Sequence, residues 1–174
     1  MSVSGTVGDH ATPLADYPHV RDDATLREVY ATLKTKYDSA EQFRSVLVLD
    51  PHDRLVGVLG LRELLHALLP DYLKHRPTRL EGAADDVTSL AGLWQEDCAE
   101  QCRKAAAMPV GAQVIPAKAT VSPGDPLVKA IFLFATLNAN ILPVVEQGRI
   151  TGVLRRVDVM AEVAAAVLAE GGAA

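Results

Sequence analysis

Cysteine and long apolar runs are both scarce in this chain of 174 residues. The most apolar windows, residues 131–135 and 163–169, are far shorter than the roughly 20 residues that a transmembrane helix needs. The first ten residues lack both a positively charged region and an apolar core, so they do not predict a signal peptide. With only two cysteines, Cys98 and Cys102, we interpret the compartment as reducing and expect a cytoplasmic protein.

The two cysteines do not predict a metal site. No histidine lies near them in the sequence, and a structural zinc ion is usually held by four ligands. Their spacing of four residues places both thiols on one side of a helix, together with Trp94. We therefore expect them to pack in a core or an interface.

Charge of one sign is not concentrated in any segment either. The chain has 17 basic and 22 acidic residues, a net charge of -5, and no basic block. This balance gives no electrostatic reason to expect nucleic acid or an anionic membrane as a partner. Nucleophile-elbow, P-loop and dinucleotide-binding glycine motifs are also missing. We expect a protein that is not an enzyme; an apolar pocket with paired titratable groups would revive the catalytic alternative.

What the sequence does contain is an internal repeat. Four blocks occur twice in the same order, with only short gaps between them. The paired blocks are 6–13 with 109–116, 19–26 with 120–127, 46–50 with 142–146, and 54–59 with 149–154. Such repetition indicates two copies of one structural unit.

Each copy predicts the same series of elements. An extended piece near Val20 or Val121 leads through turn residues into a helix, because those residues can cap its start. Two β-branched runs follow and predict a hairpin, residues 46–49 with 55–59 in the first copy. A second helix ends each copy. Its apolar stripe comprises Leu61, Leu64, Leu65, Leu68 and Leu69 in the first copy, and Val157, Met160, Ala161, Ala164 and Leu168 in the second.

The first helices of the two copies differ in their apolar pattern. In the first copy, Leu26, Val29 and Leu33 belong to a one-sided stripe. In the second copy, residues 127–137 are apolar almost all round. A helix of that kind is buried on more than one face. In so small a chain the second face is expected to contact another subunit, which predicts a homodimer.

These patterns divide the chain into four parts. Residues 1–70 form the first repeat and residues 109–170 the second. The insert between them, residues 71–108, combines a charged loop with a helix, because helical spacing begins near Ser89. Residues 171–174 are expected to be a frayed tail.

The twice-repeated β-α-β-β-α unit resembles the CBS domain. The clearest match is residues 142–154. They are similar to a hairpin of that family, in which an apolar residue is followed by proline, two valines and an acidic residue, and then by two glycines further along. The resemblance implies an α/β (α+β) fold in which two tandem repeats pack with pseudo-twofold symmetry, and modules that join as flat homodimers. It also implies clefts between the repeats that bind adenosine-containing ligands such as AMP, ADP, ATP or S-adenosylmethionine.

The family's ligand signature is glycine, two apolar residues, threonine or serine, two further residues and aspartate. A carboxylate at its end can accept hydrogen bonds from both hydroxyls of a ribose, and the adjoining helix N-terminus attracts phosphate. The second copy has Arg155 at the hydroxyl position and Asp158 at the carboxylate position. The first copy has Gly60 and Glu63 there, so both copies depart from the signature.

Two interpretations of these residues stay open. The resemblance implies that Asp158 anchors a ribose, that Arg155 or Arg156 faces a phosphate, and that Leu142 and Pro143 border the adenine. Alternatively, Asp158 favours the positive end of its helix and pairs with Arg155. On that second view Glu63 is a first-turn carboxylate beside Arg62, and Pro143 interrupts hydrogen bonding at a strand start.

Two functions follow. The chain is either a non-catalytic sensor of an adenosine-containing ligand, or a ligand-free dimeric scaffold that acts through protein–protein interaction. Neither requires a cofactor. As a sensor it would regulate a partner protein in trans, because no output domain lies outside the repeats. As a scaffold it would use residues 70–108 to bind its partner.

Overall fold

The computed structural model describes residues 4–37, 43–74 and 84–170. Within these ranges, side chains are described except at residues 37, 72, 73, 84–91, 93, 94, 96 and 170. Most of the expected loop, the expected frayed tail and the side chain of Trp94 therefore lie outside the described part. The elements are α1 (Val7–His10), β1 (Thr12–Pro13), η1 (Leu14–Asp16), β2 (His19–Arg21), α2 (Leu26–Tyr37), β3 (Ser45–Leu49), β4 (Leu55–Gly60), α3 (Leu61–Leu68), α4 (Asp71–Lys74), α5 (Ala84–Ala106), η2 (Val110–Ala112), α6 (Leu127–Leu137), β5 (Ile141–Glu146), β6 (Arg149–Arg155) and α7 (Arg156–Glu170).

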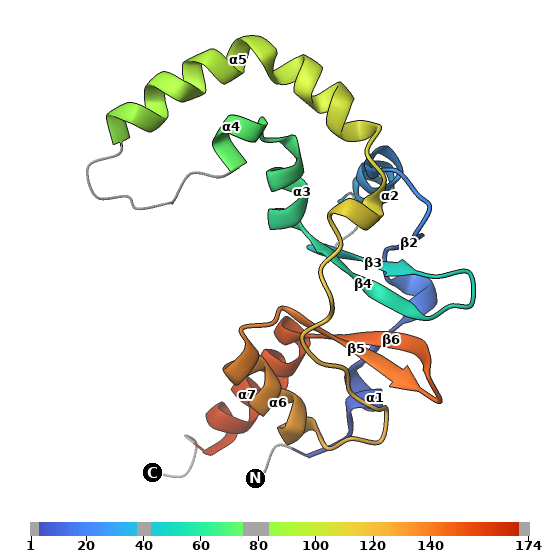
Figure 1. The fold of residues 1–174 in the computed structure, drawn as a ribbon. Helices are drawn as coiled ribbons and strands as arrows, with labels where there is room; N and C mark the ends of the chain where they lie inside the picture. Colours follow the sequence, from blue (N-terminus) through green and yellow to red (C-terminus); the bar gives the residue numbers. More distant parts are fainter. Residues whose placement is uncertain (1–3, 38–42, 75–83, 171–174) are drawn as a thin grey trace.

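Two three-stranded sheets lie between two pairs of helices (Figure 1). One sheet has the order β2-β3-β4 and lies next to α2 and α3; the other has the order β1-β6-β5 and lies next to α6 and α7. In the first copy β2 pairs in parallel with β3, and in the second an isolated bridge joins Val121 to Val144 in the same parallel sense. The predicted repeat of β-α-β-β-α units is thus confirmed.

The two copies exchange extended segments at their starts. Strand β1 lies at the start of the first copy but pairs with β6 of the second, with Thr12 opposite Val153. In return, Ile115 lies at the start of the second copy but bridges Val58 of β4 in the first. Gly152 and Gly57 lie where these segments cross, and a Cβ at either position would overlap the backbone of the incoming segment. The exchange relates the copies by a pseudo-twofold and draws the two sheets together.

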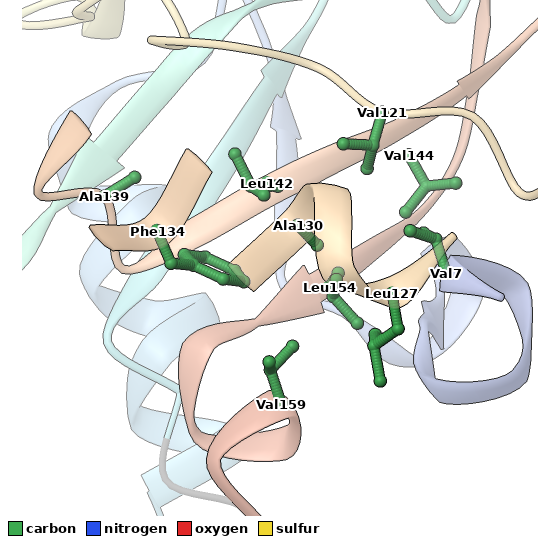
Figure 2. Packing of buried hydrophobic residues seen from close by; sticks show 10 residues of the cluster. All are labelled: Val7, Val121, Leu127, Ala130, Phe134, Ala139, Leu142, Val144, Leu154 and Val159. Carbon is green, nitrogen blue, oxygen red and sulfur yellow. The ribbon is translucent and has the colours of Figure 1, made fainter. Parts of the chain in front are cut away.

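Three apolar clusters fill the layers between these elements. One lies between α6, α7 and their sheet and includes Val7, Leu127, Phe134 and Leu142, whose side chains point toward one another in Figure 2. A second lies between α2, α3 and the other sheet. The third lies between the two sheets and combines Tyr17, Phe43, Leu47 and Leu49 with Ile150 and Val153. This third cluster holds the repeats together.

The hairpin of the second copy turns at Gln147 and Gly148. Gln147 and Gly148 both have positive φ angles, 50° and 77°, and glycine adopts that backbone region without strain. The stripe of α2 is also confirmed, because Leu26, Val29 and Leu33 are buried.

Helix α7 differs from its predicted pattern. Val157, Met160 and Leu168 of the expected stripe are exposed, whereas Val159 is buried. The face of α7 that contains Val159 packs against α6 and its sheet. The face with the predicted stripe therefore points outwards.

The inserted segment is more helical than its composition predicts. Residues 71–74 form the short helix α4 where a loop was expected, and α5 begins at Ala84, before the expected start near Ser89. Helix α5 packs against α2 and α3 of the first copy. Among the described residues, no helix is long and apolar enough to cross a bilayer.

The substitution Gly152→Ala is expected to destabilise the fold through the exchanged strand. Its new methyl group would lie 2.6 Å from the carbonyl oxygen of Thr12, so the backbone of β1 would have to move. Overpacking of this kind costs about 1–3 kcal/mol. Urea denaturation should show that loss in the free energy of unfolding.

The control for that measurement is Gly111→Ala. A Cβ at Gly111 meets no atom within 4 Å, so its free energy of unfolding should change by less than about 1 kcal/mol. Equal stability of the Gly152→Ala and Gly111→Ala variants would contradict the role assigned to the exchanged strand.

Candidate functional site

Two equivalent positions in the repeats carry the candidate site residues. Each is the point where the last strand of a copy passes into its last helix: Gly60 to Glu63 at the start of α3, and Arg155 to Asp158 at the start of α7. The same hydrogen bond marks both. The N–H of Leu61 donates to the carbonyl of Arg44, and the N–H of Arg156 donates to the carbonyl of Asn140.

A cavity of about 480 Å³ opens beside the first of these positions. We call it the Gly60 cavity. Small-molecule sites typically have volumes of roughly 300–1,000 Å³. The exchanged segment forms one wall, and the loop between α6 and β5 forms another, so both repeats contribute. It is lined by Arg44, Ser45, Val58, Gly60, Leu61, Arg62, Glu63, Ile115, Pro116, Ala117, Lys118, Asn138, Ala139, Asn140, Ile141 and Pro143.

Glu63 is the acidic group of the Gly60 cavity. The backbone N–H of Gly60 donates to Oε2 of Glu63 at 3.1 Å, which folds the carboxylate back over the start of α3. A carboxylate in the first turn of a helix also interacts favourably with the helix dipole. Oε1 of Glu63 accepts no hydrogen bond from the described residues, so it can receive one from a ligand.

Three cationic side chains surround the same cavity, and they are held differently. Lys118 donates from Nζ to the carbonyl oxygens of Leu137 and Asn138, at 2.8 and 3.2 Å, and so caps the C-terminus of α6. Arg44 and Arg62 are exposed, and their side chains form no hydrogen bond or ion pair with the described part of the chain. Their charge is available to an anion.

The second position, which we call the Arg155 junction, is arranged in another way. Arg155 Nε donates to Asp158 Oδ2 and Arg155 Nη2 donates to Asp158 Oδ1, both at 2.7 Å. This two-bond geometry is the strong form of an arginine–carboxylate pair. The two side chains are only 21% and 23% exposed. Cζ of Arg155 also lies 5.7 Å from the ring centre of Phe43, within cation–π range.

Tyr17 closes the inner side of the Arg155 junction. Its ring meets that of Phe43 edge to face, with centres 5.1 Å apart. Its hydroxyl and that of Ser45 are 2.7 Å apart and share a buried hydrogen bond. Burial raises the pKa of the Tyr17 phenol to about 12, partly offset by that hydrogen bond. The phenol therefore stays neutral throughout the physiological range.

The structure separates the residues that the sequence grouped as a ligand site. Gly60, Glu63 and Pro143 line one cavity. Asp158 and Arg155 form the pair that the alternative interpretation of Asp158 requires. Leu142 is fully buried in the cluster beside α6, and the side chain of Arg156 is exposed.

Sequence reasoning missed the cations and amides of the Gly60 cavity. Arg44, Lys118, Asn138 and Asn140 lie on loops that carry no motif of their own. In the sequence they are marked only by their place, because they lie next to β3, β5 and the exchanged segment at Ile115. Only the packing of the two copies shows that these loops meet.

The cysteines are less buried than their spacing predicted. Cys98 is half-buried, Cys102 is exposed, and their sulfur atoms lie 4.0 Å apart. Of the two expected environments, the core is excluded for Cys102, and packing in an interface stays a prediction. Within the described residues, no group of three or more histidine, cysteine, aspartate or glutamate side chains is placed to hold a metal ion.

Solved structures of similar fold contain paired CBS domains. The structure of CBSX2 in complex with AMP has 24% sequence identity and a TM-score of 0.61, and the match covers 95% of this chain and 98% of that one. A CBS domain-containing protein of unknown function from Kribbella flavida has 20% identity and a TM-score of 0.69, covering 92% and 98%.

The cytosolic domain of the Mg²⁺ channel MgtE, in complex with ATP, has 24% identity and a TM-score of 0.61; the match covers 90% of this chain and 48% of that one. At these identities the likeness shows a shared fold. A search of curated proteins by sequence found no match.

The sequence model of the CBS domain matches residues 7–70 and 113–165, which together make up well over half of the chain. These two segments are the two repeats whose sheets and exchanged strands the structure shows. The chain belongs to the CBS domain family, as a tandem pair of repeats.

Proposed function

We propose that this chain is a non-catalytic regulatory module that binds an adenine nucleotide in the Gly60 cavity. The observation that carries the proposal is the combination found there: an apolar slot, one carboxylate at a helix start, and two arginines without partners among the described residues. A nucleotide presents the three matching groups, namely a flat base, a ribose diol and phosphate.

Each part of the nucleotide has a counterpart in the lining. Val58, Ile115 and Ile141 offer apolar surface to the base, with Pro143 beside them. Oε1 of Glu63 can accept a hydrogen bond from a ribose hydroxyl, and a bond to a charged acceptor is stronger than a neutral one.

The charges favour a phosphate-bearing ligand. Arg44 and Arg62 supply positive charge at the rim of the cavity, where a guanidinium can hold a phosphate with two parallel hydrogen bonds. S-adenosylmethionine carries a sulfonium cation, which these side chains would repel. We therefore favour AMP, ADP or ATP. The AMP and ATP complexes of CBSX2 and of the MgtE cytosolic domain support this choice.

Binding becomes regulation only if the ligand prefers one arrangement of the repeats. The Gly60 cavity is suited to such a preference, because its walls come from both copies. A nucleotide that contacts Arg62 of α3 and Asn140 beside β5 would stabilise one relative position of those elements. A protein partner would then respond to that change in trans.

A second candidate function, a ligand-free dimeric scaffold, has its own supporting observation. The outer faces of α6 and α7 carry exposed apolar side chains: Val128 is 54% exposed, Phe132 65%, Val157 66% and Met160 55%. The two helices pack side by side. Val128 and Val157 correspond to Arg27 and Arg62 of the first copy, which suit solvent, whereas Met160 corresponds to Leu65, which is 65% exposed. We propose that α6 and α7 form a homodimer interface.

Replacing both Arg44 and Arg62 with alanine is expected to weaken nucleotide binding. A ligand at 100 times its Kd should stabilise the wild-type chain by about 2.7 kcal/mol. A hydrogen bond to a charged group contributes about 1.5–3 kcal/mol, so the double variant should bind AMP, ADP or ATP at least roughly tenfold more weakly. Thermal unfolding and calorimetric titration measure both effects.

The matched control is Arg54→Ala, because Arg54 is an exposed arginine of the β3–β4 hairpin that does not line the cavity. It should bind the nucleotide like the wild type. A wild-type chain that none of the three nucleotides stabilises would refute the proposed ligand class and favour the scaffold function.

The substitution Phe132→Asp should convert the dimer into a monomer. Phe132 lies near the middle of α6 with about two thirds of its side chain exposed, so the change leaves the core intact but would bury a charge in the interface. Sedimentation velocity at micromolar concentration should give a dimer for the wild type. It should also give a dimer for Val56→Asp, which introduces the same charge at an exposed position of β4. A monomeric wild type contradicts the proposed interface.

A further inference from the structure

We propose that Arg155 is a built-in occupant of the second ligand position, so that each chain binds one nucleotide rather than two. This inference rests on the proposed function, because it concerns the pseudo-symmetric counterpart of the Gly60 cavity. It assigns Arg155 the role of a group that determines how many nucleotides the module accepts.

The two positions are framed in the same way. The Gly60 cavity lies where Ile115 bridges Val58, and the Arg155 junction lies beyond the point where Thr12 pairs with Val153. The shared hydrogen bonds from Leu61 and Arg156 fix the equivalence of the flanking residues. Gly60 then corresponds to Arg155, Glu63 to Asp158, and Ala139 to Phe43.

Side-chain size differs at two of these paired positions in the same direction. The Gly60 cavity has no side chain at Gly60 and a single methyl group at Ala139. The Arg155 junction has a guanidinium and a phenyl ring at the corresponding places, and Cζ of Arg155 lies 5.7 Å from the centre of the Phe43 ring. Two small residues leave space in one cleft, whereas two large ones contact each other in the other.

The guanidinium also takes over the hydrogen-bonding role of a ligand. Both oxygens of Asp158 accept from Arg155 at 2.7 Å, so the groups that would hold a ribose diol already have donors. Displacing Arg155 would leave a carboxylate that is more than three quarters buried without its charge partner, which is strongly unfavourable. A nucleotide would have to offset that loss before gaining any contact of its own.

Equilibrium dialysis with AMP, ADP and ATP, taken to saturation, tests this occupancy. The wild type should bind one nucleotide per chain. Arg155→Gly, which copies the residue found at position 60, should bind two. In the reverse exchange, Gly60→Arg should abolish binding, because the new guanidinium can pair with Glu63. Circular dichroism of both variants should match that of the wild type.

The outcomes separate this inference from the proposed function. Two nucleotides per wild-type chain would overturn the inference and leave the proposed function standing. A folded Arg155→Gly variant that still binds one, or a Gly60→Arg variant that still binds, would also overturn it. If the wild type binds none but Arg155→Gly binds one, the nucleotide function of the Gly60 cavity fails and the role of Arg155 holds. No binding by either chain rejects both.

Discussion

The exchange of extended segments between the two repeats is the constraint on which the rest of this structure depends. Residues at the start of each copy add to the sheet of the other, Thr12 beside Val153 and Ile115 beside Val58. Neither crossing tolerates a Cβ on the facing strand, which is why Gly57 and Gly152 stand there. The exchange brings the two sheets into contact through the Tyr17 and Phe43 cluster.

Pseudo-symmetry of the backbone does not extend to the chemistry of the two clefts. On one side, Gly60 leaves the start of α3 open, and Glu63 folds back onto its own N-terminus. On the other, Arg155 stands at the equivalent position and pairs with Asp158. Three consecutive residues around the start of β3 contribute to both places, because Phe43 faces Arg155 while Arg44 and Ser45 line the cavity.

A similar asymmetry distinguishes the outer faces. The second helix pair exposes Val128 and Val157, whereas the first carries Arg27 and Arg62 at the equivalent positions. Burying such apolar surface against another copy would be favourable, because burial contributes about 25 cal/mol per Å². The two repeats thus differ, one with a cavity opening at its last strand and the other with exposed apolar side chains on its helices.

The sequence by itself determined the repeat, the order of elements within it, and the two strand-to-helix junctions, because periodicity and turn residues act over short distances along the chain. It also showed the departures at Gly60 and Arg155. It could not decide that β1 would join the other copy's sheet, that Val159 rather than Val157 would face the core, or that Arg44, Lys118 and Asn140 would surround one cavity. Those features depend on contacts between segments far apart in sequence. Only the packing of two sheets against each other decides which side chains meet, and so which of them surround the Gly60 cavity.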